Sequence, residues 1–397
     1  MKSIRTIYKI GFGPSSSHTM GPQRASVSFM KRNIDATNYK VYIYGSLALT
    51  GKGHLTDYII LKTLGEDKTE VVFEYTKELP FHPNGMMFEA YKDGRIIDSW
   101  TVYSIGGGNI VDESNSLEPE KEVYEIDNMT DTLKYCVDNK LSILEYIKSL
   151  EDENLEAYLN EVFEVMMASV EEGLVREEPL PGYLKVNRRA KNVYNKYLEN
   201  NDFDSLLFAA SLATSEMNAS GGKIVTAPTC GSCGVIPGIL YSYYKTNMYT
   251  KEELINSLYI AGFIGNLIRT NASISGAEVG CQGEVGAASS MASAMVCYLK
   301  GGTNEQIEYA AEVGLEHHLG MTCDPVGGYV QIPCIERNAI SAKRSVDCAK
   351  YALLTDGKHY ITLDHVIKTM NETGKDLHHK YRETSLGGLA NGAFECK

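Results

Sequence analysis

The chain has 397 residues, of which 43% are hydrophobic and 22% charged, and its formal net charge is −13. This length predicts two or three domains. The acidic balance argues against nucleic acid or an anionic membrane surface as the main partner. The N-terminus lacks the apolar core of a signal peptide, and no later segment approaches the roughly 20 apolar residues that span a bilayer. We therefore expect a cytoplasmic protein.

The first part of the chain, residues 1–128, has the pattern of an α+β domain. Pro22 stands near the first position of an expected helix, where its missing N–H costs little. Runs that alternate and are rich in β-branched and aromatic residues predict strands, and the turn around Gly94 gives the clearest hairpin signal. The expected elements are a helix over 21–30, strands over 39–46 and 70–75, and a hairpin of 86–91 with 95–105.

An acidic stretch without periodicity, residues 111–131, marks the expected domain boundary. After it the strand signals nearly vanish, and apolar residues follow helical spacing from Leu155 to Val170. The sequence thus predicts a multidomain α and β protein with an all-α second domain over 129–397. Further helices are expected over 188–200, 251–270, 285–299, 304–318, 338–354 and 362–371.

The nine cysteines are the strongest chemical signal. An odd count in a reducing compartment indicates metal binding or reactive thiols more than a disulfide scaffold. Cys323 and Cys334 flank a turn rich in Gly and Pro that suits the presentation of sulfur, and Cys281 lies in another glycine-dense segment. Spacing alone favours the Cys230–Cys233 pair, because a C-x-x-C turn suits zinc, redox chemistry or an iron–sulfur cluster.

Residues 11–19, GFGPSSSHT, form a second candidate site. Successive small residues leave N–H and hydroxyl groups free to surround an anion such as a carboxylate. The segment is not a phosphate-binding P-loop, because the Gly-Lys-Ser/Thr ending is absent. The alternative is a serine-rich turn that only caps the following helix. The residues concerned are Ser15, Ser16, Ser17 and His18.

A histidine beside a glycine and near Thr56 is a candidate general base. His54 occupies this position in GKGHLTD, and a neighbour that fixes its tautomer would suit it to proton transfer. His18 and His82 are candidates on the same grounds. The alternative for each is a structural or solvated histidine.

Motifs spread over nearly the whole chain resemble the iron–sulfur L-serine dehydratases of bacteria, in the form that carries both domains on one polypeptide. They run in the family's order, and together they are far more specific than any one alone. The matching segments include GPSSSHTMGP (13–22), YGSLALTGKGHLTD (44–57), SGGKIVTAPTCGSCG (220–234), NASISGAEVGCQGEVGAA (271–288), EHHLGMTCDPVGGYVQIPCIERNA (316–339) and KYRETSLGGLA (380–390).

The resemblance implies conversion of L-serine to pyruvate and ammonia by a PLP-independent, oxygen-sensitive enzyme of serine catabolism and gluconeogenesis. It also implies a homodimer, and a first domain similar to the regulatory substrate-binding domain of some phosphoglycerate dehydrogenases. His54 becomes the base for the Cα proton. A [4Fe–4S] cluster with one open iron would be held by Cys281, Cys323 and Cys334, with Cys396 as a candidate fourth ligand. Substrate contacts would come from Ser15, Ser16, Ser17, His18, Thr56, His82, Asn84 and Ser104.

Two departures from the family pattern and two alternatives remain. The first domain is shorter than in many relatives, mainly between Tyr58 and Phe81, and Lys397 follows Cys396 where relatives often end near a cysteine.

Threonine or another small hydroxy acid is an alternative substrate, because one methyl group changes binding by only about 1–3 kcal/mol. The non-enzyme alternative is a cluster-bearing sensor of amino acids.

Overall fold

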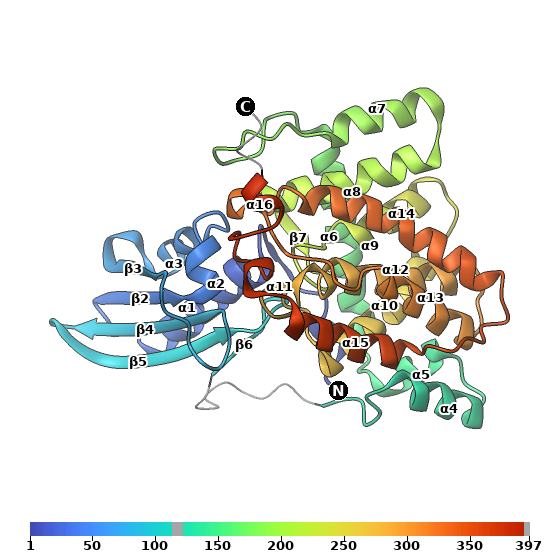
Figure 1. Cartoon of the computed structure of the whole chain (residues 1–397), viewed down its shortest axis with the longest axis horizontal. Coiled ribbons are helices and arrows are strands. Elements are labelled where there is room, and N and C mark those ends of the chain that lie inside the picture. The colour runs from blue at the N-terminus through green and yellow to red at the C-terminus, as the bar shows by residue number, and fades with distance from the viewer. Residues whose placement is uncertain (113–121, 393–397) are drawn as a thin grey trace.

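The computed structural model describes residues 1–112 and 122–392. An α+β part lies at one end of the molecule and a helical body at the other (Figure 1). This arrangement confirms the expected fold class. The expected boundary segment, 111–131, falls partly on 113–121, outside the described residues, so a boundary at residue 128 stays a prediction.

The α+β part is built on a five-stranded sheet in the order β3-β2-β4-β5-β6. β2 and β3 pair in parallel and the other neighbours are antiparallel. Helices α1 and α3 pack together beside the sheet. The surface buried between these helices and the sheet is apolar, with Phe29 against Phe88 and Trp100. The bounds are α1 (Gly21–Arg32), β2 (Asn38–Tyr44), α2 (Gly45–Thr50), α3 (Thr56–Leu64), β3 (Thr69–Glu74), β4 (Gly85–Lys92), β5 (Arg95–Ser104) and β6 (Ile110–Val111).

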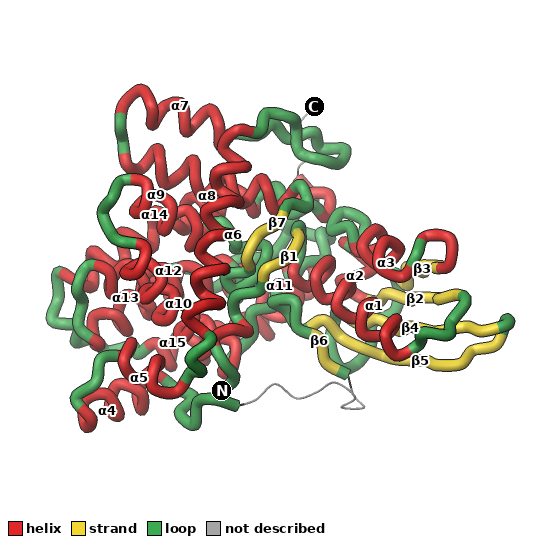
Figure 2. The backbone as a smooth tube through the Cα atoms, turned by 180° about the vertical axis from the view of Figure 1, so that it is seen from behind, coloured by secondary structure: helices red, strands yellow, loops and turns green. Residues whose placement is uncertain are grey.

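The N-terminal segment joins the helical body rather than the sheet. Strand β1 (Ile10–Phe12) pairs antiparallel with β7 (Lys223–Val225), as Figure 2 shows from behind. Tyr8 lies in the core of the helical body, and its hydroxyl donates to the carbonyl oxygen of Leu258 at 2.8 Å. The first residues therefore tie the α+β part to the helices.

The helical body surrounds α12 (Val285–Leu299), which is buried from Val285 to Cys297. Its sequence is rich in Ala, Ser and Gly, so neighbouring helices approach closely. The Ser290 hydroxyl donates to the carbonyl oxygen of Ala311 on α13 at 2.7 Å, which satisfies a polar group inside the core. The other helices are α4 (Met129–Asn139), α5 (Ile143–Leu150), α6 (Leu155–Val175), α7 (Ala190–Asn200), α8 (Phe203–Ala219), α9 (Val235–Lys245), α10 (Lys251–Asn271), α11 (Gly276–Val279), α13 (Asn304–Glu316), α14 (Cys334–Leu353), α15 (Leu363–Asp376) and α16 (Leu389–Gly392).

The expected elements are present with shifted ends, and several helices were not expected. The strand over 39–46 ends at Tyr44, because Gly45 adopts φ +53° and begins α2. The helix expected from residue 338 starts at Cys334, directly after Pro333. Sequence patterns missed α8 and α9, whose sides are buried nearly all round, so amphipathic periodicity is absent.

Within residues 1–112 and 122–392, no helix combines the length and apolar character needed to cross a membrane.

Candidate active site

One small, enclosed cavity gathers side chains from both parts of the molecule. Ser15 and His54 reach it from the α+β part, and the three cysteines of the helical body line it from the other side. The C-terminal segment contributes Glu383. The ionisable or nucleophilic side chains that line the cavity are Ser15, His54, Cys281, Glu284, Cys323, Cys334 and Glu383.

The two histidines of the site are positioned through their backbones. His18 lies in a helical turn, Ser16–Met20, that runs directly into α1, and the Ser15 hydroxyl accepts its backbone N–H at 3.0 Å. The Thr56 hydroxyl donates to the carbonyl oxygen of His18 at 2.6 Å, and the Thr19 hydroxyl donates to that of His54 at 2.7 Å. These bonds fix the backbones of both residues without using their imidazole rings.

His54 is held close to the cysteine loop by a glycine. A Cβ atom on Gly53 would lie 2.5 Å from the carbonyl oxygen of Gly328, between Cys323 and Cys334, so only glycine permits this approach. His54 is 1% exposed, and among the described residues neither ring nitrogen has a hydrogen-bond partner. Burial, and then the nearby His18, lower the pKa of His54 well below its ordinary value. The ring is therefore a neutral, unengaged base.

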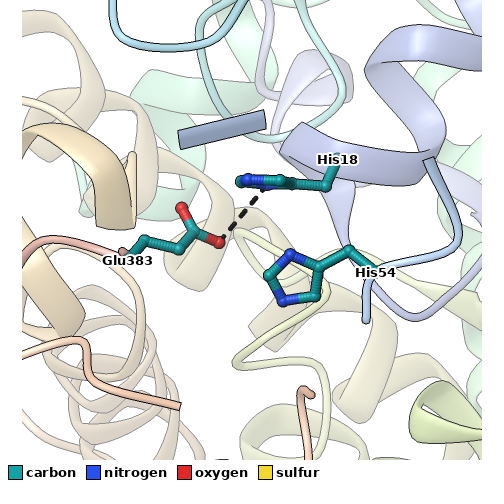
Figure 3. Close-up of side chains that lie close together, drawn as sticks. All are labelled: His18, His54 and Glu383. Carbon is teal, nitrogen blue, oxygen red and sulfur yellow. Dashed lines mark ion pairs between the residues drawn. The ribbon is translucent and has the colours of Figure 1, made fainter. Parts of the chain in front are cut away.

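His18, His54 and Glu383 form one cluster (Figure 3). The rings of the two histidines lie 4.4 Å apart, and Nδ1 of His18 is 3.5 Å from Oε1 of Glu383. Nε2 of His18 lies 3.3 Å from the Ser46 hydroxyl, which itself donates to the carbonyl oxygen of Glu383 at 2.8 Å. Burial lowers the pKa of His18 to about 3, and burial followed by Glu284 raises that of Glu383 well above its usual range. The pair is thus neutral, not ionic.

The three cysteines come from separate segments of the helical body. Cys281 lies in the turn that follows α11, Cys323 in the loop after α13, and Cys334 is the first residue of α14. All three are buried. The adjacent Cys281 and burial raise the pKa of the Cys323 thiol, and burial raises that of Cys334. The thiols of Cys323 and Cys334 therefore become thiolates only when a cation binds beside them.

Charged side chains surround the sulfur atoms. The Glu284 carboxylate Oε2 lies 3.9 Å from both Cys281 Sγ and Cys323 Sγ, and burial raises the pKa of Glu284 to about 7. Arg337 donates to the carbonyl oxygen of Thr322 at 2.6 Å and lowers the pKa of Cys334 against the effect of burial. The buried donors Cys281, Glu284 and Cys323 lie close enough together to hold a metal ion.

The C-terminal segment fastens the two sides of the cavity together. The backbone N–H of Cys323 donates to the carbonyl oxygen of Tyr381, and the N–H of Glu383 donates to that of Cys323, both at 2.8 Å. The Ser385 hydroxyl donates to the carbonyl oxygen of Pro325 at 2.6 Å. Together with the bond from Ser46, these contacts hold Glu383 against both the cysteine loop and the α+β part.

Several predicted substrate-contact residues lie outside the cavity lining. Ser16, Ser17 and Thr56 are buried in the elements that carry the histidines, and the Thr56 hydroxyl is engaged as described above. His82 accepts the N–H of Asn84 through Nδ1 at 3.0 Å, and its Nε2 is 3.5 Å from Glu278 Oε1. Asn84 Oδ1 and Ser104 Oγ have no partner among the described residues, so they remain available for polar contacts.

The C-x-x-C pair does not line the cavity. Cys230 and Cys233 are buried in an apolar cluster with Met20 and Met217, and Cys230 Sγ lies 3.3 Å from Met20 Sδ. Burial raises the pKa of both thiols. Cys396 lies outside the described residues.

Sequence reasoning missed Glu284 and Glu383. Each is a single carboxylate without a motif of its own, although both stand within segments that carried the family resemblance. A glutamate three residues after Cys281, and one in the C-terminal RETS sequence, are the signals that could have indicated them.

The fold and the site together define a two-part protein in which buried thiols of a helical body share one cavity with His54 of an α+β part. A family model described as serine dehydratase alpha chain matches residues 82–390, and one described as serine dehydratase beta chain matches residues 3–72. The chain therefore belongs to the serine dehydratase family.

Full-length relatives agree with this assignment. The chain is 41% identical to L-serine dehydratase 2 of Escherichia coli K12, covering 100% of both proteins. It is 41% identical to L-serine dehydratase of Streptomyces coelicolor, over 99% of each chain. Identity to L-serine dehydratase of Haemophilus influenzae is 42%, over 98% of this chain and 99% of the relative. The first alignment extends over 457 residues, more than the 397 present here, so that relative has residues without a counterpart in this chain.

Proposed function

We propose that this protein is a PLP-independent L-serine dehydratase that converts L-serine to pyruvate and ammonia, with a [4Fe–4S] cluster held by Cys281, Cys323 and Cys334. The observation that carries the proposal is the shared cavity, in which His54, with neither ring nitrogen engaged, faces these three buried cysteines. The relatives named L-serine dehydratase, at about 40% identity over nearly the whole chain, supply the reaction and the substrate.

The residues present fit such a cluster. Three cysteines from separate segments meet at one place, which matches the cysteine thiolate ligation of iron–sulfur clusters. The raised pKa values of Cys323 and Cys334 mean that these two thiols ionise on binding a cation, and Glu284 and Glu383 add further carboxyl groups. When bound through three cysteines, the cluster supplies a Lewis-acidic iron, the chemistry that helps a hydroxide leave.

His54 is the base in this proposal. Its neutral ring takes the Cα proton of L-serine on a ring nitrogen, a contribution of roughly 10²–10⁴-fold for a well-placed base. A carboxyl oxygen of Glu383 can accept a hydrogen bond from the resulting imidazolium, since one carboxyl oxygen and one ring nitrogen of each histidine lie within 4.8 Å of one another. Loss of the Cα proton and the hydroxyl group gives 2-aminoacrylate and water, and the aminoacrylate tautomerises and hydrolyses to pyruvate and ammonia.

Ser15 and the neighbouring turn orient the substrate carboxylate. Ser15 lines the cavity, and its hydroxyl lies 3.4 Å from Nδ1 of His18. The turn therefore acts both as the cap of the helical segment and as one wall of the site. Asn84 and Ser104, with unpartnered polar atoms among the described residues, are the next candidates for substrate contacts.

Anaerobic purification with iron reconstitution tests the proposal. We expect a broad visible absorption band, pyruvate formation from L-serine, and loss of both on exposure to air. L-threonine is the competing substrate in the same assay. Colourless protein that still deaminates L-serine would contradict the cluster, and coloured protein without turnover would contradict the lyase assignment.

We also propose that the enzyme acts as a cytoplasmic homodimer, as the resemblance implies. Size-exclusion chromatography with light scattering tests this, and a monomer at working concentration would contradict it.

A further inference from the structure

A second cavity lies between α13 and α14 and shares no lining residue with the candidate active site. Its volume is about 670 Å³, which suits a small organic molecule. Tyr309, Tyr351, Tyr360 and His359 supply aromatic walls, and Val313 and Ile340 add apolar surface. The residues proposed for catalysis take no part in it.

Contacts among the aromatic side chains, and with the loop that carries His359, hold the wall of this cavity in place. The rings of Tyr309 and His359 stack 4.0 Å apart with an interplanar angle of 6°, and Tyr309 meets Tyr351 edge-on at 5.8 Å. Glu308 fixes the loop that carries His359: one carboxylate oxygen lies 2.5 Å from His359 Nε2, and the other accepts the N–H of Leu363 at 2.7 Å. The walls are therefore held before any ligand arrives.

A buried carboxyl group, that of Glu312, lines this cavity without a salt bridge to any described residue. Glu312 is 2% exposed, and its Oε1 has no hydrogen-bond partner in the described part of the chain. Burial raises the pKa of Glu312 to about 8, and the like-charged Glu316 and Glu308 add to this effect. A buried carboxylate oxygen without a donor is costly, so a cationic donor in the cavity would be strongly favoured.

The cations at the rim are engaged elsewhere. Lys343 pairs with Asp204 at 3.4 Å and with Asp347 at 3.2 Å. Arg344 donates to the carbonyl oxygen of His317 at 3.3 Å. Glu312 therefore lacks a salt bridge to either of these cations, and the charged groups next to it, Glu308 and Glu316, are acidic.

We propose that the cavity between α13 and α14 binds a small organic molecule carrying a protonated amino group. The ammonium group donates to Glu312 and lies among tyrosine rings, which attract cations through their faces, and the apolar body packs against Val313 and Ile340. The ligand contacts both helices that flank the cysteine loop, since α13 leads into Cys323 and α14 begins at Cys334.

Isothermal titration calorimetry on the full-length protein tests the site with two probes of the same shape. Phenethylammonium carries the positive charge, and 2-phenylethanol replaces it with a neutral hydroxyl group. We expect the amine to bind at least about tenfold more tightly than the alcohol. Glu312→Gln should weaken amine binding at least about tenfold and leave the alcohol unchanged. Glu305→Gln, on the exposed side of the same helix, is the matched control and should change neither.

A second variant keeps the test decisive if Glu312→Gln fails to fold. Tyr360 is fully exposed, so Tyr360→Ser leaves the core intact and should weaken amine binding a few-fold. Equal affinity for amine and alcohol would overturn the proposal. The proposal would also be overturned if the amine did not bind and Tyr360→Ser changed a dimer into a monomer. In that case the face would be a contact between copies of the chain.

Discussion

The two halves of the candidate site are built in different ways. The sulfur half sits at helix ends and a tight turn of the helical body, with Glu284 and Arg337 close to the cysteines. The imidazole half is carried by short elements of the α+β part, where threonine hydroxyls hold the backbones of His18 and His54. The cysteines thus have the ionisable side chains of Glu284 and Arg337 beside them, whereas His54 has no partner at its ring nitrogens among the described residues.

This difference indicates that the two halves have different roles, one in binding and one in proton transfer. The pKa of Cys323 is raised by the adjacent Cys281 and by burial, and that of Cys334 by burial, so these thiols ionise when a cation binds and the sulfur half is suited to holding one. A neutral histidine with no engaged ring nitrogen is suited to moving a proton. A substitution can therefore disable one half of the site and leave the other intact. Four predictions test this independence, from the largest expected effect to the smallest.

Cys323→Ser breaks the sulfur half. We expect loss of bound iron and of the visible absorption band, and a fall in pyruvate formation on the order of 10³-fold, since a metal Lewis acid contributes several kcal/mol. Iron analysis and the spectrum check binding independently of turnover. Cys348→Ser, in α14 and away from the candidate active-site cavity, is the matched control. Wild-type iron content in Cys323→Ser would remove Cys323 from the ligand set.

His54→Gln breaks the imidazole half alone. We expect kcat to fall roughly 10²–10⁴-fold while iron content and absorption stay at wild-type levels, because the base is lost and the cysteines are unchanged. His365→Gln, on the exposed face of α15, serves as the control. Retained kcat would assign the base to another group.

Glu383→Gln tests the residue that joins the halves. The substitution keeps the side-chain shape and the backbone bonds to Cys323 but removes the acid group beside His18. We expect kcat/KM to fall about tenfold, the scale of one charge-assisted contact, with iron content unchanged. The exposed Glu372→Gln on α15 is the control. An unchanged kcat/KM would make Glu383 a structural residue only.

The buried histidines also make stability depend on pH. The pKa of His18 is lowered in the folded protein from 6.5 to about 3, so the unfolded chain binds the extra proton. The contribution of neutral His18 to the free energy of unfolding is present above pH 6.5 and is lost as the pH falls toward 3. The loss between pH 6.5 and pH 5 is about 2 kcal/mol.

Thermal unfolding at several pH values measures this dependence. His18→Gln should lose fewer degrees between pH 6.5 and pH 5 than the wild type, because it lacks the titrating ring. Glu284 and Glu383 have the opposite effect on stability. Because their pKa values are raised in the folded protein, they stabilise the folded state at low pH, and this stabilisation is lost as the pH rises. Equal losses in His18→Gln and wild type would contradict the prediction.

The sequence by itself determined the elements whose signals are local. The β4–β5 hairpin follows from alternation and its glycine turn. Helix α13 lies close to its expected bounds because its periodicity and its capping by Thr303 are properties of neighbouring residues. The cysteines, His54 and the serine-rich turn were found as residue types in glycine-rich settings, and the family resemblance then chose among them.

Only the tertiary structure decided which of these residues meet. Local spacing favoured Cys230 and Cys233, yet these pack into an apolar cluster, whereas Cys281 joins Cys323 from a distant segment. The roles of Glu284 and Glu383, and the pairing of β1 with β7, likewise depend on contacts between residues far apart in the chain. Spacing reports the geometry of a turn or a helix face, but convergence depends on how whole helices pack, and no short stretch of sequence contains that information.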